Sequence, residues 1–192
     1  KTYTVEEIRE YLNKYSDLVL PRLTDTSNYL QKALKANKKV LFEGAQGAML
    51  CLTYGTFPFV TSSSPLANAI PSNAGLPAGS VAKTCGIVKA YTTRVGAGPF
   101  PSEIEDPEIA QIIRDKGHEY GTVTGRARRI GWLDAAQLKY VVSITGAKHA
   151  ALMLTDVLSV VKTIKICTKY QINGIDIDYR PSSLPELYEV TP

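Results

Sequence analysis

Apolar residues recur at helical spacing in four stretches of the chain. The first follows the tetrapeptide TVEE, in which Thr4 and Glu7 have the arrangement of a capping box. The apolar positions of this stretch recur with the periodicity of a helix: Val5, Ile8, Tyr11, Leu12 and Tyr15. The same spacing predicts helices over 26–35, 106–117 and 132–145. In the stretch 106–117, a proline in the first turn and a final glycine mark the two ends.

Shorter apolar runs predict strands. The segment KVLFEG (39–44) has the pattern of a short buried strand that ends in a glycine and leads into a turn. The segment 85–95 predicts a helix or a strand that runs into a glycine-proline turn. The run at 149–159 predicts a buried strand that ends at Asp156.

A hairpin is predicted near the C-terminal end of the sequence. Two strand-like segments, 163–174 and 175–181, meet at the dipeptide Asn173-Gly174, which is typical of a tight hairpin turn. Together with the helices and the other strands, this pattern predicts an α/β fold with a mainly parallel sheet, flanking helices and a small antiparallel hairpin. No internal boundary is visible, so we expect residues 1–192 to form part of a single domain.

The composition narrows the class of protein. Of 192 residues, 44% are hydrophobic and 21% charged, as in an ordinary globular domain. The net charge of +4 is small, which favours an anionic small ligand at least as much as nucleic acid. The three cysteines lack metal-ligand spacing, and we expect Cys85 and Cys167 in the core. Because no membrane-length apolar run or signal peptide is visible, we expect a cytoplasmic protein without a membrane partner.

The densest fixed charge lies in GTVTGRARRIGWLD (121–134). Arg126, Arg128 and Arg129 follow two glycines whose backbone N–H groups can also bind oxygen. Arginine offers planar, bidentate donors that suit carboxylates and phosphates, so this loop is a candidate anion site. One alternative is a solvated basic turn. A nucleic-acid site is another, and the small net charge and the lack of interleaved aromatic residues argue against it.

Three further features could bind a nucleotide. Gln46, between small residues in FEGAQG, offers a donor and an acceptor that suit a purine edge, although it could equally cap a helix. Thr61 in VTSS could help to hold a phosphate. Asp156 in LTDV could pair with the two donors of a guanine edge, or act as the N-cap of a following turn.

Taken in order, these motifs resemble one family. The chain carries VLFEGAQG, YGTFPFVTSS, GIVKAYTTRVGAGPFPSE, GTVTGRARRIGWLD, TDVLS and IKICTKY in series. This series resembles adenylosuccinate synthetase from Thr4 to the C-terminus. The resemblance implies a homodimeric enzyme of purine biosynthesis that joins L-aspartate to inosine monophosphate (IMP), using GTP and magnesium. The products are adenylosuccinate, GDP and phosphate, formed through 6-phosphoryl-IMP.

The resemblance also implies roles for individual residues. Those implied to bind IMP are Gln46, Thr61 and Arg126. Those implied to form the L-aspartate pocket are Val95, Gly121, Thr124, Arg126 and Arg128. Those implied to contact GTP are Arg128, near its phosphates, and Asp156, at the guanine base.

The sequence also departs from the pattern of the family. The GDEGKGK-like phosphate loop, with its catalytic aspartate and the histidine that follows, does not occur in these 192 residues. The catalytic residues and the Mg²⁺ ligands are therefore expected outside the chain. We expect the chain to be the central piece of a synthetase that is inactive alone; the alternative is a complete, non-catalytic nucleotide-binding module. Within the matched motifs, the substituted positions are Cys51, Thr53, Tyr54, Val123, Ala127 and Leu154.

Overall fold

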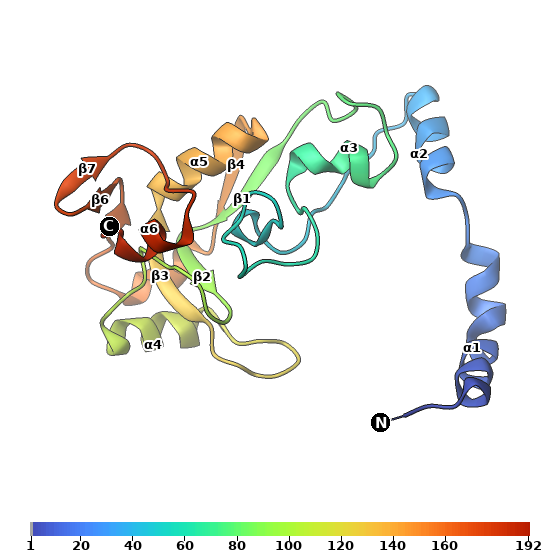
Figure 1. Cartoon of the computed structure of the whole chain (residues 1–192), viewed down its shortest axis with the longest axis horizontal. Coiled ribbons are helices and arrows are strands. Elements are labelled where there is room, and N and C mark those ends of the chain that lie inside the picture. The colour runs from blue at the N-terminus through green and yellow to red at the C-terminus, as the bar shows by residue number, and fades with distance from the viewer. Residues whose placement is uncertain (1) are drawn as a thin grey trace.

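The computed structural model describes residues 2–192 (Figure 1). In chain order, the helices are α1 (Val5–Val19), α2 (Thr26–Lys35), α3 (Ile70–Asn73), α4 (Pro107–Lys116), α5 (Ala135–Thr145) and α6 (Leu184–Glu189). The strands are β1 (Cys85–Lys89), β2 (Tyr91–Arg94), β3 (Arg129–Asp134), β4 (His149–Met153), β5 (Ile166–Cys167), β6 (Tyr170–Ile172) and β7 (Ile175–Ile177). Short 3₁₀ helices are η1 (Leu20–Arg22), η2 (Ala48–Leu50), η3 (Ala67–Ala69) and η4 (Thr155–Val160).

The strands form parallel and antiparallel pairs. β1 pairs with β4 in parallel, and β3 pairs in parallel with β5 and antiparallel with β2. β6 and β7 form an antiparallel hairpin whose turn contains Asn173 and Gly174, both with positive φ. The predicted α/β class, with parallel strands, helices and a small antiparallel hairpin, is confirmed.

The main core lies between α4, the β2–β3 pair and η4. Its buried members are Ala90, Tyr91, Ile104, Ala110, Ile113, Ile130, Val157 and Leu158. Helix α4 is positioned by Asp106, whose carboxylate accepts from the backbone N–H groups of Glu108 and Ile109 at 2.9 and 3.2 Å. The prediction for 106–117 is therefore confirmed at both ends.

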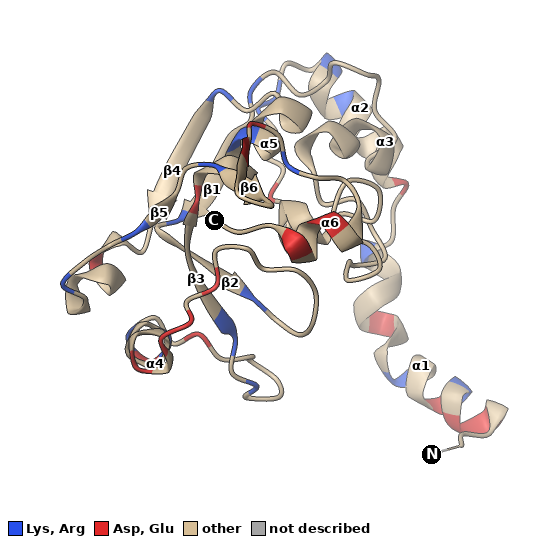
Figure 2. Ribbon diagram, turned by 60° about the vertical axis from the view of Figure 1, so that its left-hand side comes forward, with Lys and Arg blue, Asp and Glu red and all other residues tan. Residues whose placement is uncertain are grey.

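Helix α1 stands apart from this core in both views of the molecule (Figures 1 and 2). Its capping box is formed as predicted: Thr4 Oγ1 accepts from Glu7 N at 3.2 Å, and Glu7 Oε2 accepts from Thr4 N at 2.8 Å. None of the residues of α1, all of which the structure describes, is buried. No helix within residues 2–192 is long and apolar enough to cross a lipid bilayer.

Some of the predicted elements are wrong in part or in full. The segment 39–44 is not a strand, and Leu41 within it is 92% exposed. No described strand pairs with this segment, and a lone extended segment cannot satisfy its backbone through a ladder. The helix predicted over 132–145 begins only after Asp134, because the residues up to Asp134 pair with β2 and β5. Asp134 then caps α5 by accepting from Gln137 N at 2.8 Å.

The β1–β4 pair differs from the predicted buried strand at 149–159. β4 ends at Met153, and its side chains are mostly exposed, as is Ile87 of β1 at 73%. Within residues 2–192 this sheet contains two strands, and no helix packs closely against its faces. Cys85 is exposed for the same reason, which corrects its predicted place in the core, whereas Cys167 is buried as predicted.

Candidate functional site

A pocket of about 580 Å³ is lined by the segment 46–50, by strands β1 and β2, and by helix α5. Three predicted site residues from distant parts of the sequence line it together: Gln46, Val95 and Arg128. Lys89 and Tyr91, which motif reasoning did not single out, line it as well. The pocket is therefore the candidate site.

Three of the lining side chains converge on one buried carboxylate, Glu119. Lys89 Nζ donates to Glu119 Oε1 at 2.6 Å, and the Tyr91 hydroxyl donates to the same oxygen at 2.7 Å. Arg128 Nη1 donates to Oε2 at 2.5 Å. The side chain of Glu119 is 2% exposed. We refer to Lys89, Tyr91, Glu119 and Arg128 as the Glu119 cluster.

The partners of Glu119 fix its charge. Burial alone would raise the pKa of Glu119, but hydrogen bonds from Lys89 and Tyr91 and the charge of Lys89 lower it below its ordinary value of 4.5. Burial and the hydrogen bond to Glu119 raise the pKa of Tyr91, so this hydroxyl stays a neutral donor. Two cations thus share one carboxylate, and the cluster presents a net positive charge to the pocket.

The backbone of residues 119–128 holds this geometry. Arg128 N donates to Glu119 O at 3.0 Å, and Gly121 N donates to Arg126 O at 2.8 Å. Arg114 of helix α4 donates from Nε to Arg128 O at 2.9 Å. The segment is a narrow loop fixed at its base to α4, with Val123 at 96% exposure near its tip. The base positions Arg128 at the pocket, while the tip projects into solvent.

The three arginines of this loop have three different environments. Arg128 lies at the pocket, as described above. Arg129 pairs with Glu103 through two hydrogen bonds, donates to Gly98 O at 2.8 Å and lies over the ring of Phe100. Arg126 is exposed, and within residues 2–192 its guanidinium has no hydrogen bond or ion pair. The basic residues at the ends of β2 and β3 are visible in Figure 2.

The remaining predicted residues of this loop lie outside the pocket lining. Gly121 is partly buried, Thr124 is exposed, and the Thr124 hydroxyl accepts from Arg126 N at 3.4 Å. Neither residue lines the pocket. The structure therefore brings Arg128 to the site without Gly121, Thr124 or Arg126.

The glutamine and threonine motifs meet beside the pocket. Gln46 has a φ of 57°, a left-handed conformation that changes the direction of the backbone just before η2. Thr61 N donates to Leu50 O at 2.8 Å, which returns the chain to the segment 46–50. Arg94, at the end of β2, fixes the intervening loop by donating from Nη2 to Thr56 Oγ1 and to Phe59 O at 2.9 and 3.1 Å. Thr61 thus borders the segment that lines the pocket but does not line it itself.

Asp156 lies on η4, exposed to solvent and outside the pocket lining. The alternative interpretation of Asp156 as an N-cap is wrong, because η4 begins at Thr155 and the capping position is taken by Leu154. Leu154 has a φ of 61°, and no side chain caps this turn. The structure leaves Asp156 free to contact a ligand from η4.

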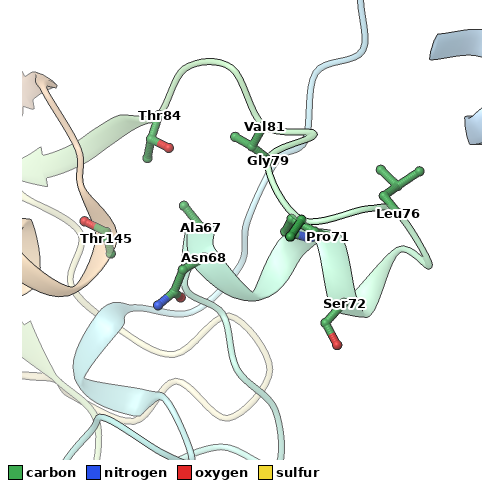
Figure 3. Close-up of a pocket in the computed structure, with 10 residues that line it drawn as sticks. Ala67, Asn68, Pro71, Ser72, Leu76, Gly79, Val81, Thr84 and Thr145 are labelled. Atoms are coloured by element: carbon green, nitrogen blue, oxygen red, sulfur yellow. The ribbon is translucent and has the colours of Figure 1, made fainter. Parts of the chain in front are cut away.

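A second pocket of about 460 Å³ lies between η3, α3 and the segment 76–84, with Thr145 at its border (Figure 3). Its walls combine apolar side chains, such as those of Pro71 and Leu76, with the hydroxyls of Ser72 and Thr84. None of the site residues predicted from the sequence lines it.

The candidate site offers no set of metal ligands among the described residues. In the part of the chain that the structure describes, no group of three or more His, Cys, Asp and Glu side chains could hold a metal ion. Asp134, the carboxylate that lines the candidate pocket, accepts from Gln137 N and from the Tyr170 hydroxyl, at 2.8 and 2.6 Å. Glu119, behind the pocket, accepts from the three donors of its own cluster. These residues do not fit a magnesium site.

Sequence reasoning missed Glu119, Lys89 and Tyr91. Lys89 and Tyr91 lie within the motif GIVKAYTTRV, but the sequence does not show that this segment lies beside the arginine loop. Glu119 follows a helix-ending glycine and a histidine, a context that is typical of an exposed loop. Two of its three partners, Lys89 and Tyr91, lie about thirty residues earlier in the sequence, and the third, Arg128, lies at the other end of the same loop.

The chain is similar to known proteins over nearly its whole length. A family model described as adenylosuccinate synthetase matches residues 1–192. The adenylosuccinate synthetase of Thermoanaerobacter sp. (strain X514) is 48% identical over 190 residues, which are 99% of this chain and 44% of that relative. The corresponding protein of Malacoplasma penetrans is 50% identical over 91% of this chain and 41% of its own length. This chain therefore spans less than half the length of these relatives.

A solved structure agrees with the sequence matches. The fully ligated adenylosuccinate synthetase from Plasmodium falciparum superposes with a TM-score of 0.91 at 36% sequence identity. The match covers 100% of this chain and 46% of that structure. The arrangement of elements described above is therefore that of a part of this fold.

Proposed function

Because this chain belongs to the adenylosuccinate synthetase family, we propose that it supplies the IMP- and L-aspartate-binding part of an enzyme that makes adenylosuccinate. The reaction joins L-aspartate to IMP with GTP as the energy source, through 6-phosphoryl-IMP, and releases GDP and phosphate. One observation carries the proposal: Gln46, Val95 and Arg128, which come from separate motifs, line a single pocket.

The chemistry of the pocket suits these substrates. Gln46 offers the donor and acceptor that a purine edge requires, and we assign it to IMP together with Thr61 and Arg126. Arg128, backed by the net positive charge of its cluster, suits a carboxylate, and we assign it to L-aspartate. The other residues assigned to L-aspartate are Val95, Gly121, Thr124 and Arg126.

The contacts proposed for GTP lie partly outside the pocket, and no metal ligand is proposed within this chain. We assign Asp156 to the guanine base, because a carboxylate accepts from both donors of that edge, and Arg128 to the GTP phosphates. The family also implies a homodimer and Mg²⁺, which polarises phosphoryl oxygens when bound. We assign no residue of this chain to the metal, since the described residues do not fit such a site.

The test uses both this chain and the longest natural gene product that contains it. The gene product should form adenylosuccinate from IMP, GTP and L-aspartate, which can be followed by chromatography of the nucleotides. The 192-residue chain should bind IMP in calorimetry without turnover, because the general base of the family is not among its residues.

The alternative is a non-catalytic nucleotide-binding module. Under that alternative, the gene product binds IMP but releases no adenylosuccinate or phosphate. A protein that binds none of the three substrates would overturn both proposals.

A further inference from the structure

Glu119 is a buried carboxylate, and both of its oxygens accept hydrogen bonds from the Glu119 cluster. Its three donors come from the end of β1 (Lys89), the start of β2 (Tyr91) and the end of the arginine loop (Arg128). Burying a charge is unfavourable unless hydrogen bonds and opposite charges compensate for it. The net contribution of such a buried ion cluster to the stability of the fold is therefore small, and its clearer effect is to fix the arrangement of its own side chains.

The geometry that it fixes is that of the two cations. The side chains of Lys89 and Arg128 remain 32% and 29% exposed, and both line the pocket, whereas Glu119 lies behind them at 2%. Lys89 Nζ is also held by Thr93 Oγ1 at 2.9 Å. Both cations are thereby restrained at the pocket before any ligand binds, which reduces the ordering that binding requires.

Arg128 also retains unused donor capacity. Its Nε is buried and has no acceptor among the described residues, while Nη1 is bonded to Glu119. Nη2 has no hydrogen bond among the described residues either, and the side chain is 29% exposed, so Nη2 can donate to a ligand oxygen in the pocket. A lysine and an arginine side by side suit a carboxylate or a phosphate, and the carboxylate is the one that matches the L-aspartate pocket assigned to Arg128 above.

We propose that Glu119 is a positioning residue that holds Lys89 and Arg128 as a paired cation for a carboxylate of the amino-acid substrate. The inference rests on the proposed function and adds Lys89 to the substrate contacts. Glu119 acts through the two cations and does not touch the substrate. Tyr91 completes the positioning by filling the remaining acceptor site of Glu119 Oε1.

The chain offers a matched control. Arg129, the neighbour of Arg128, also pairs with a carboxylate, Glu103, but it holds the loop around Gly98 and does not line the pocket. Arg129 and Arg128 have similarly exposed side chains, at 32% and 29%. A purely structural arginine–carboxylate pair is thus available for comparison.

The experiment measures the kinetics of the gene product that contains this chain, as Glu119→Gln and as Glu103→Gln. In Glu119→Gln, the KM for L-aspartate should rise roughly tenfold or more while the KM for IMP stays within about twofold, because only the carboxylate-binding cations lose their orientation. In Glu103→Gln, both KM values should stay within about twofold of those of the unsubstituted protein.

Further outcomes separate the inference from the proposed function. If Glu119→Gln does not fold, Lys89→Gln tests the inference instead, because Lys89 is partly exposed and its substitution leaves the core intact. The KM of Lys89→Gln for L-aspartate should rise roughly threefold to tenfold. An unchanged KM for L-aspartate in folded Glu119→Gln, or failing that in Lys89→Gln, would overturn the inference. If the unsubstituted protein forms no adenylosuccinate at all, the proposed function fails instead.

Discussion

Helices α1 and α4 both begin at a side chain that caps free backbone N–H groups. Thr4 forms the capping box of α1, and Asp106 accepts two N–H groups at the start of α4. Their tertiary environments differ. Helix α4 buries Ala110 and Ile113 against β3 and η4, whereas α1 has no buried residue, and its Val5 is 75% exposed.

The difference shows that the formation of a helix is signalled by local sequence, whereas its stability depends on tertiary packing. Caps and apolar spacing predict that a segment will be helical, and they do so for both helices. Most of the stability of a helix in a protein, however, comes from packing its apolar face, and isolated helices of this length are marginal in water. Helix α4 has such a packing surface among the described residues, and α1 has only local contacts, such as the edge-to-face pair Tyr11–Tyr15.

The largest expected effect is the loss of core packing in α4. Ile113→Ala should lower the free energy of unfolding by about 2–5 kcal/mol, because Ile113 is 0% exposed and its removal leaves a cavity. The matched change in α1, Ile8→Ala, should lower it by less than about 0.5 kcal/mol. Denaturant unfolding of the 192-residue chain measures both. Equal losses would show that α1 packs against something in solution.

The same contrast explains what the sequence predicted about the fold. Helix α4 and the β6–β7 hairpin could be predicted because their signals are local: a cap, a proline, a final glycine and an Asn-Gly turn. The segment 39–44 could not, since an apolar run becomes a strand only where another strand pairs with it. The start of α5 was misplaced because β2 and β5 pair with residues up to Asp134 and override the helical spacing.

The candidate site divides in the same way. Gln46, Val95 and Arg128 could be found from motifs, and the structure places them around one pocket. Glu119 could not be found, since nothing in its neighbourhood signals burial, and its partners lie 9 to 30 residues away. A buried charge is defined by its tertiary partners, so local sequence carries little information about it.

The second prediction compares a glycine in the core sheet with one in the exposed sheet. A Cβ at Gly131 of β3 would lie 2.5 Å from the ring of Phe100 and 2.8 Å from Ser102 O. Gly131→Ala should therefore destabilise the chain by about 1–3 kcal/mol through overpacking. At Gly86 of β1, the nearest atom lies at 3.8 Å, so Gly86→Ala should be nearly neutral. Thermal unfolding measures both variants, and a large loss for Gly86→Ala would contradict the open character of the β1–β4 sheet.

The third prediction compares the caps. Asp106→Ala should cost about 1 kcal/mol of global stability, because two N–H groups of α4 lose their acceptor within a packed element. Thr4→Ala should fray α1 with little change in global unfolding, since α1 can open without exposing a core. Hydrogen exchange resolves the two cases. Faster exchange confined to α1 is expected for Thr4→Ala, and protection lost throughout the chain would argue that α1 is part of the cooperative unit.

The smallest expected effect concerns Glu119, a charged residue that is buried in the core region, whereas α1 has no buried residue. The pKa of Glu119 is lowered on folding, so its stabilising contribution is present above its ordinary value of 4.5 and is lost as the pH falls through the lower, folded value. Asp134 acts in the opposite direction, because burial raises its pKa and acidification relieves that penalty. The two contributions partly cancel, so the net change should be small. Glu119→Gln removes the first contribution alone; its free energy of unfolding should fall less than that of the unsubstituted chain as the pH is lowered from 7 to well below 4.5. Identical pH profiles would show that Lys89, Tyr91 and Arg128 do not hold Glu119 ionised in the folded state.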